Sequence, residues 1–210
     1  MAKFNSYLLG KMRNSVGNVT TCYVNKQNIA KAKIFARKDV KTPEILAQRA
    51  KMAALTAVIR RTLPVIRKGF AGVGKGSPSN AFTSVNMAAV LVDENYAATI
   101  DYEHLLMGSG MLYPPKVSVE YNTETKKYIF SQETQESEEG FALVTDKVYA
   151  VLIEETKNRT KLLALRERGE SGSTSYALPE DWDAAKVHAY CFATTKNGKS
   201  ASDSSYLVIA

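Results

Sequence analysis

The positive charge of this chain is concentrated near its N-terminal end, which limits how these residues can pack. Residues 1–75 contain sixteen Lys and Arg against two acidic residues, whereas the remaining 135 residues contain twelve against nineteen. Like charges held close together repel one another unless an acidic partner neutralises them. The chain of 210 residues and net charge +7 thus combines a +14 segment with a −7 body. This pattern predicts an acidic partner for the basic segment. The partner could be the acidic body of a neighbouring copy, another acidic protein, or nucleic acid.

The overall composition is typical of a globular protein, because 45% of the residues are hydrophobic and this is enough to build a core. The apolar run at Tyr7–Leu9 is too short for a signal-peptide core. No stretch reaches the roughly eighteen apolar residues of a membrane span. We therefore expect no membrane partner and a protein that is made in the cytoplasm and either stays there or leaves by a route that reads no signal.

The first 40 residues have the pattern of a β-hairpin. β-Branched and aromatic residues over Val16–Val24 and Ile29–Arg37 flank the turn-forming run Asn25–Asn28. Side chains alternate between the two faces of a strand, so one face of the second strand is cationic with an aromatic residue in it: Lys31, Lys33, Phe35 and Arg37. Such a face is either a partner-binding surface or an ordinary solvated strand face.

A long amphipathic helix follows the hairpin. Thr42-Pro43-Glu44 places a hydroxyl residue, a proline and an acid in the order that a helix start requires. An apolar stripe with helical spacing then runs through Ile45, Met52, Leu55, Ile59, Leu63, Ile66 and Phe70. Pro64 predicts a kink or break, since proline cannot donate the helical hydrogen bond. Arg60 and Arg61 lie outside the stripe and are candidate partner-binding residues.

The rest of the chain changes from helical to strand periodicity. Ser77–Asn80 resembles the cap of a second, shorter helix that extends to Val90. A strand is predicted at Ala98–Leu106, and seven short strands follow from Lys116 onward, spaced by turn signals as in a β-sandwich: Lys116–Tyr121, Tyr128–Ser131, Lys147–Glu155, Lys161–Arg166, Ser173–Ala177, Val187–Thr194 and Ser204–Ile209. The glutamate-rich run Gln132–Glu139 between two of them is predicted to be a solvated loop.

These elements predict an α+β fold with two parts. Residues 1–112 form a basic N-terminal hairpin and helical region, and residues 113–210 form an immunoglobulin-like or fibronectin-like β-sandwich. Tyr113-Pro114-Pro115 is the predicted linker, because a residue that precedes proline is biased away from helix. The sandwich core should include Trp182, Val187, Ala189, Tyr190 and Phe192, with the strand from Val187 buried on one side.

Catalytic and metal-binding patterns are weak. Residues 69–75 match the start of a phosphate-binding P-loop, but Gly76 replaces the required Ser or Thr and the run follows a helix. His104 and His188 fall in different predicted elements without ligands at suitable spacing. Cys22 and Cys191 lack a CxxC partner and are expected to be free thiols. We therefore expect no enzyme activity, no cofactor and no metal.

Several short runs resemble an uncharacterised protein family of similar length that is encoded in gut bacteria of the Bacteroides type and in their phages. They are Leu8-Leu9-Gly10, Val16-Gly17-Asn18-Val19, Thr42-Pro43, Gln48-Arg49-Ala50-Lys51-Met52, Val187-His188-Ala189-Tyr190, Asn197-Gly198-Lys199 and Ser202–Tyr206. The chain departs from the family at Thr20–Tyr23, where members usually carry a Gly-rich stretch with Trp. The resemblance implies an N-terminal hairpin, helices and an immunoglobulin-like sandwich, without an established activity.

Together these observations predict a structural protein of a phage virion. It would be an accessory component of the capsid or of the neck and tail, and its partners would be other virion proteins in a homo- or hetero-oligomer. The basic region would dock through Lys31, Lys33, Arg37, Arg60 and Arg61. The alternative is a nucleic-acid-associated protein in which the same cations contact phosphates.

Overall fold

The chain has a mixed α and β fold, as predicted, and divides into two compact units. The computed structural model describes residues 1–210 except 9, 37, 38, 75, 139 and 158. Unit 1 comprises Met1–Thr42 and unit 2 comprises Pro43–Ala210. The change of periodicity along the sequence predicted the division between residues 112 and 113 instead.

Unit 1 is a four-stranded antiparallel sheet in the order β1-β4-β3-β2. Its strands are β1 (Ala2–Phe4), β2 (Asn14–Val16), β3 (Val19–Val24) and β4 (Gln27–Ala32). The predicted hairpin is β3 with β4. Asn25 and Lys26 join the two strands with φ of 50° and 62°, the left-handed values that a tight two-residue hairpin turn requires.

The second hairpin strand is shorter than predicted. It ends at Ala32, so Lys33 and Phe35 lie beyond β4 and the strict alternation of faces does not extend to them. Arg37 lies outside the described residues. The backbone N–H of Lys33 still donates to the carbonyl of Asn18 at 2.8 Å, which holds this residue beside the sheet.

Unit 2 begins with the two predicted helices, α1 (Pro43–Gly69) and α2 (Pro78–Asn86). Both start at a proline, which fits the first turn of a helix because its missing N–H would have no partner there. Pro64 lies inside α1, which continues for five more residues. The second helix ends four residues before Val90, because Val90–Val92 forms strand β5 and pairs with β6 (Ala98–Ile100).

The seven strands predicted from Lys116 onward are confirmed and form two antiparallel sheets. One sheet has the order β11-β8-β7 and the other has the order β10-β9-β12-β13. Their bounds are β7 (Val117–Asn122), β8 (Lys127–Gln132), β9 (Lys147–Glu154), β10 (Arg159–Glu167), β11 (Gly172–Ala177), β12 (Val187–Thr194) and β13 (Ser205–Leu207), with a short 3-10 helix at Ala184–Lys186.

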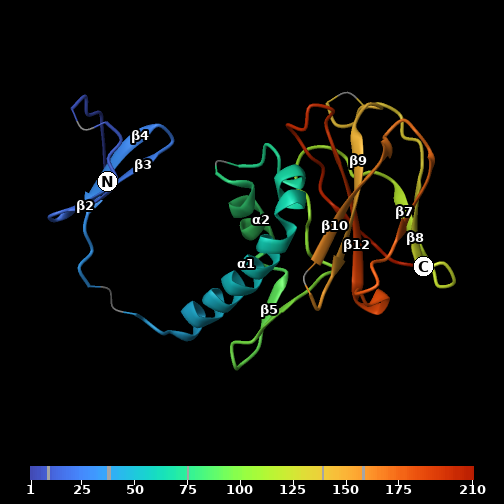
Figure 1. The fold of residues 1–210 in the computed structure, drawn as a ribbon, viewed down its shortest axis with the longest axis horizontal. Coiled ribbons are helices and arrows are strands. Elements are labelled where there is room, and N and C mark those ends of the chain that lie inside the picture. The colour runs from blue at the N-terminus through green and yellow to red at the C-terminus, as the bar shows by residue number, and fades with distance from the viewer. Residues whose placement is uncertain (9, 37–38, 75, 139, 158) are drawn as a thin grey trace. The chain divides into compact units, whose positions relative to one another are not determined.

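The four-stranded sheet is the middle of three layers, with α1 and α2 on one face and the β7–β8 side on the other (Figure 1). Val187, Ala189 and Cys191 of β12 pack toward the smaller sheet, whereas Tyr190 and Phe192 pack toward the helices. The prediction that this strand is buried on one side was therefore wrong. Helices cover the face that a two-layer sandwich would expose to water.

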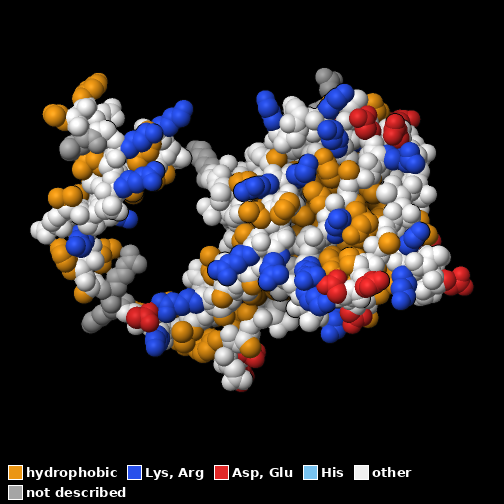
Figure 2. Space-filling model, viewed as in Figure 1, with side chains coloured by type: hydrophobic (Ala, Val, Ile, Leu, Met, Phe, Trp, Pro, Cys, Tyr) orange, Lys and Arg blue, Asp and Glu red, His pale blue; other side chains and the backbone are white. Residues whose placement is uncertain are grey.

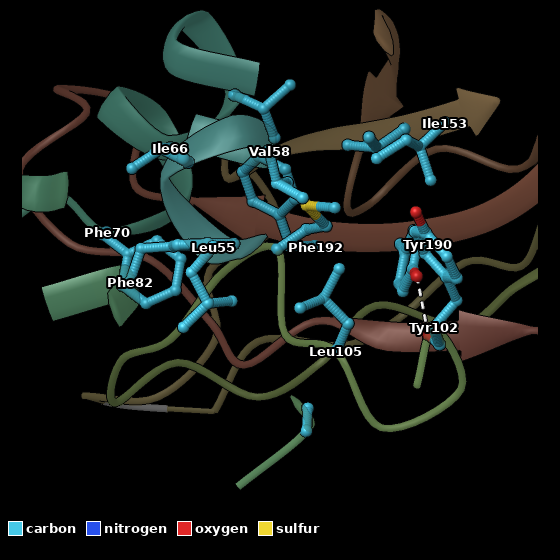
Figure 3. Packing of buried hydrophobic residues seen from close by; sticks show 14 of the residues in the cluster. Leu55, Val58, Ile66, Phe70, Phe82, Tyr102, Leu105, Ile153, Tyr190 and Phe192 are labelled. Atoms are coloured by element: carbon cyan, nitrogen blue, oxygen red, sulfur yellow. Dashed lines mark hydrogen bonds between the residues drawn. The ribbon is translucent and has the colours of Figure 1, made fainter. Parts of the chain in front are cut away.

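Helix α1 contributes an apolar face to the core on that side (Figure 3). Leu55, Val58 and Ile66 are fully buried there against Phe192. The predicted stripe was displaced, since Met52 is 41% exposed. Buried positions of α1 that the stripe omitted are Val58, Thr62 and Val65.

Two aromatic contacts complete this core. The rings of Phe70 and Phe82 meet edge to face with centroids 5.6 Å apart. The hydroxyl of Tyr190 donates to the carbonyl of Tyr102 at 2.6 Å, so the buried phenol has a partner (Figure 3). Burial raises the pKa of Tyr190 well above its usual value. The core predicted at Val187, Ala189, Tyr190 and Phe192 is confirmed, while Trp182 is half-buried against the other core.

The shared core explains why the helices belong with the sheets. Side chains of α1, α2, β9 and β12 form one continuous cluster, so no division falls between residues 112 and 113. The Tyr113–Pro115 segment also makes contacts rather than linking separate domains. The N–H of Tyr113 donates to the carbonyl of Phe141 at 3.0 Å, and Pro115 is buried.

A buried arginine joins the loops at one end of the two sheets. Arg168 and Asp146 are fully buried, and Nε of Arg168 lies 3.5 Å from Oδ2 of Asp146. The guanidinium also donates to Oε1 of Gln135 at 3.0 Å and to the carbonyl of Tyr113 at 2.7 Å. Asp146 favours the charged form of Arg168, although burial lowers the pKa of the guanidinium overall. Within the predicted solvated loop Gln132–Glu139, Gln135 is thus held by a buried side chain and Gln132 is itself buried at the end of β8, while Glu139 lies outside the described residues.

We expect Arg168→Ala to lower the free energy of unfolding by about 3–5 kcal/mol, because it leaves a buried carboxylate without its cation. Arg166→Ala, which removes an exposed arginine two residues away, should cost less than about 0.5 kcal/mol. Chemical denaturation measures both. A loss below about 1 kcal/mol for Arg168→Ala would contradict the assigned role.

Candidate partner-binding site

Unit 1 lacks an apolar core. Thr21 and Asn28 are its only buried residues among those that the structure describes. Asn28 accepts from the N–H of Met12 at 3.1 Å and donates to the carbonyl of Gly10 at 2.8 Å, while Thr21 donates to the carbonyl of Asn14 at 2.9 Å. Hydrogen bonds therefore hold this sheet together, with little burial of apolar surface to stabilise it.

Phe4, Met12, Tyr23 and Ile29 of unit 1 are half-buried, whereas nine other large apolar side chains are exposed. They are Met1, Tyr7, Leu8, Val16, Val19, Val24, Ile34, Phe35 and Val40, each between 42% and 104% exposed. Exposed apolar side chains gathered on a small element are typical of a binding surface. The surface of unit 1 therefore resembles one half of a protein–protein interface.

The same surface is strongly basic. Residues 1–42 contain nine Lys and Arg and one acidic residue, a net charge of +8. Lys31 is exposed on β4, and Nζ of Lys33 lies 5.4 Å from the centroid of the Phe35 ring. A second pair places Nζ of Lys11 5.3 Å from the Tyr23 ring. Cations and apolar rings are thus interleaved, as a partner with both acidic and apolar groups would require.

Arg60 and Arg61 of α1 lie in a separate basic hollow within unit 2. This hollow has a volume of about 480 Å³ and is lined by Ala57, Arg60, Arg61, Thr156, Lys157 and Arg159. Lys157 and Arg159 both pair with Asp181, Lys157 at 3.5 Å. Arg60 and Arg61 make no ion pair with any residue that the structure describes.

A second basic hollow lies near the end of α1. It has a volume of about 280 Å³, and its lining includes Arg67, Lys68, Lys147 and Lys196. Nζ of Lys68 lies 4.8 Å from the Tyr149 ring and 3.3 Å from its hydroxyl. Figure 2 shows Lys and Arg side chains along α1 and at its margin with the sheets. The helix thus carries a basic face between two hollows.

The structure brings the predicted residues together in two groups. Lys31 and Lys33 belong to unit 1, whereas Arg60 and Arg61 belong to unit 2. Lys157 and Arg159 complete the hollow beside Arg60 and Arg61 but were not predicted from the sequence. Both residues lie about 100 positions after Arg60 and Arg61 in the sequence, just beyond an acidic strand end. Sequence spacing therefore could not predict that they are neighbours of the two arginines.

The histidines have structural contacts. The His188 ring stacks on Tyr102 with centroids 4.4 Å apart, and its Nδ1 lies 3.2 Å from the Tyr206 hydroxyl. Burial lowers the pKa of His188. Nδ1 of His104 lies 2.8 Å from Asp101, and this hydrogen bond lowers the pKa of the carboxyl.

Close packing explains two glycines of the run at residues 69–76, Gly69 and Gly72. A β-carbon at Gly69 would collide with the carbonyl of Met107, and one at Gly72 with the carbonyl of Lys199. Gly72 also has a φ of +77°, which favours glycine. Lys75 lies outside the described residues. The run follows α1, so it lacks the strand that precedes a P-loop.

In the described part of the chain, no group of three or more His, Cys, Asp or Glu side chains is placed to hold a metal ion. No described helix is both long and apolar enough to span a membrane.

Residues 10–208 match the model of a family of unknown function, DUF6266. The match covers nearly the whole chain, and the chain belongs to this family. Comparisons with curated proteins and with solved structures found no match.

The missing core of unit 1 predicts fast amide hydrogen exchange in the isolated protein. Amides of β3 and β4 should exchange at least about a hundredfold faster than those of β9 and β12, since the latter lie between two apolar cores. Mass spectrometry of peptides after timed labelling measures the difference. Equal protection in β3 and β9 would contradict the idea that unit 1 depends on a partner.

Proposed function

We propose that this chain is a non-catalytic structural protein that docks through its basic N-terminal region on an acidic, partly apolar protein surface. The observation that carries the proposal is that unit 1 exposes nine large apolar side chains, while its only fully buried residues among those described are two polar ones. A sheet of this size without an apolar face packed against something gains too little stability to persist alone. A docked partner would supply the missing core, and the charge of unit 1 selects an acidic one.

We propose a phage particle as the setting, with the chain as an accessory component of the capsid or of the neck and tail. The resemblance to a family encoded in phages of Bacteroides-type bacteria supports this setting. The absence of a recognisable catalytic pattern in the sequence is consistent with it. The partners would then be other virion proteins or further copies of this chain.

The two sheets of unit 2 would serve as a rigid module of immunoglobulin or fibronectin type. Strand order supports this reading. When β7 to β13 are labelled A, B, C, C′, E, F and G, the sheets are A-B-E and C′-C-F-G, an arrangement similar to the two antiparallel sheets of immunoglobulin folds. The helices on the outer face of the second sheet are an addition to that plan.

Nucleic-acid binding is the second candidate function, and the hollow beside α1 favours it. Arg60 and Arg61 face Lys157 and Arg159 across a space large enough for phosphate groups. Such cations would displace counterions and give an affinity that falls steeply with salt. Asp181 partly neutralises the far side of the hollow, which weakens the case.

The proposal predicts that the double change Lys31→Glu and Lys33→Glu stops incorporation of the protein into particles. Reversing two exposed charges on the basic surface replaces attraction by repulsion, so the fraction that sediments with assembled particles should fall at least about tenfold. Lys127→Glu with Lys186→Glu, two exposed lysines on unit 2, is the matched control and should be incorporated normally. Incorporation of the Lys31/Lys33 variant at the wild-type level would overturn the proposal.

A binding measurement separates the second candidate. The purified protein is titrated with random duplex and single-stranded DNA from low to physiological salt. We expect no binding at physiological salt. Tight binding that depends steeply on salt and is abolished by Arg60→Glu with Arg61→Glu would favour the nucleic-acid function instead.

A further inference from the structure

An exposed apolar cluster lies on unit 2 next to the buried Arg168. Its members are Met111, Tyr113, Phe141, Leu143 and Val144, each between 41% and 78% exposed. The Tyr113 and Phe141 rings stack with centroids 5.3 Å apart, and their backbones are hydrogen-bonded. The cluster therefore has a defined shape before any partner binds.

Acidic side chains border this cluster. Exposed glutamates lie at Glu133, Glu136, Glu138 and Glu170. Backbone hydrogen bonds tie their segments to the cluster, from Glu138 to Ala142 at 2.7 Å and from Gly169 to Val144 at 2.9 Å. Arg168 holds the same segments from beneath through Gln135 and Tyr113. We call the apolar cluster and these glutamates the acceptor surface.

We infer that the acceptor surface binds unit 1 of a second copy of this chain. The inference rests on the proposed function and names its partner. The two surfaces are complementary in both charge and polarity. Unit 1 has a net charge of +8 and exposes side chains such as Ile34 and Phe35, while the acceptor surface presents glutamates around exposed apolar residues. Docking would cover apolar residues on both sides and neutralise charge at the rim.

A second copy fits this role better than the same chain. Figure 1 shows that α1 starts at one end of unit 2, and that the loop between β8 and β9 lies at the other end. The 27 residues of α1 span about 40 Å. Ten residues, 33–42, connect β4 to α1, and ten residues reach at most about 36 Å when fully extended. Docking within one chain would hold this connection near its limit, whereas docking between copies has no such restriction.

Each copy would thus present one donor and one acceptor. Such a heterologous contact repeats from copy to copy and produces either a closed ring or an open row, depending on the rotation between neighbours. A closed ring or a repeating row is also the form in which an accessory protein would occupy a symmetric particle.

Sedimentation velocity on full-length variants tests the inference. Wild-type protein should associate as its concentration rises. The donor variant Lys31→Glu/Lys33→Glu and the acceptor variant Glu133→Lys/Glu136→Lys should each associate at least about tenfold more weakly. The chain with all four reversals should regain association, because its charges are again complementary. Lys127→Glu/Lys186→Glu should behave as wild type, and circular dichroism checks that every variant is folded.

Mixing provides a sharper result. The donor variant retains an intact acceptor surface and the acceptor variant retains an intact unit 1. The two reversed surfaces are also complementary to each other, so an equimolar mixture should associate as wild-type protein does, with the two variants alternating, although each variant alone associates weakly. A photo-crosslinking amino acid in place of Phe35 should then react with residues 111–144 of the other copy. Both results are expected under the inference.

Three outcomes would overturn the inference without removing the proposed function. The acceptor variant could associate as strongly as wild type. The crosslink could form within one chain, or with another part of unit 2. Wild-type protein could remain monomeric at high concentration while its incorporation into particles still depends on Lys31 and Lys33. A different result would contradict the proposed function itself, namely normal incorporation of the Lys31/Lys33 variant into particles.

Discussion

The packing of α1 across the four-stranded sheet is the contact on which the rest of unit 2 depends. Leu55, Val58 and Ile66 press on the outer face of β9 and β12, while the inner face of the same strands packs against β7 and β8. Burial on both faces turns these two strands into the centre of the molecule. It also makes the helices part of the same cooperative structure as the sheets, so a long basic helix is displayed on a rigid base.

The two units obtain their stability from different sources. Unit 2 has two apolar cores and a buried Arg168–Asp146 pair that fixes the loops at one end. Unit 1 has a hydrogen-bonded ladder whose two buried residues, among those described, are polar, and it leaves nine large apolar side chains exposed. We proposed docking because of this difference: covering a surface that is both apolar and strongly basic with an acidic, apolar surface would lower the free energy of the system.

Only part of the candidate site could be predicted from residue patterns in the sequence. The cations at Lys31, Lys33, Arg60 and Arg61 were identified from charge segregation, which depends only on composition along the chain. The assignment of two of them to a separate unit, and the addition of Lys157 and Arg159, required the fold. The acceptor surface escaped notice because its apolar members come from segments 30 residues apart, and no local periodicity marks them as neighbours.

The sequence by itself determined the elements of this protein. Turn residues, helix caps and alternation are local signals, so the hairpin, both helices and the seven strands could be predicted. Only the tertiary structure decided which faces are covered. Thr62 is buried in α1 because its hydroxyl bonds to the carbonyl of Val58 at 2.9 Å, whereas Met52 is exposed, and neither outcome follows from side-chain polarity. The division at residue 42 likewise arises from packing between distant segments, which no local pattern encodes.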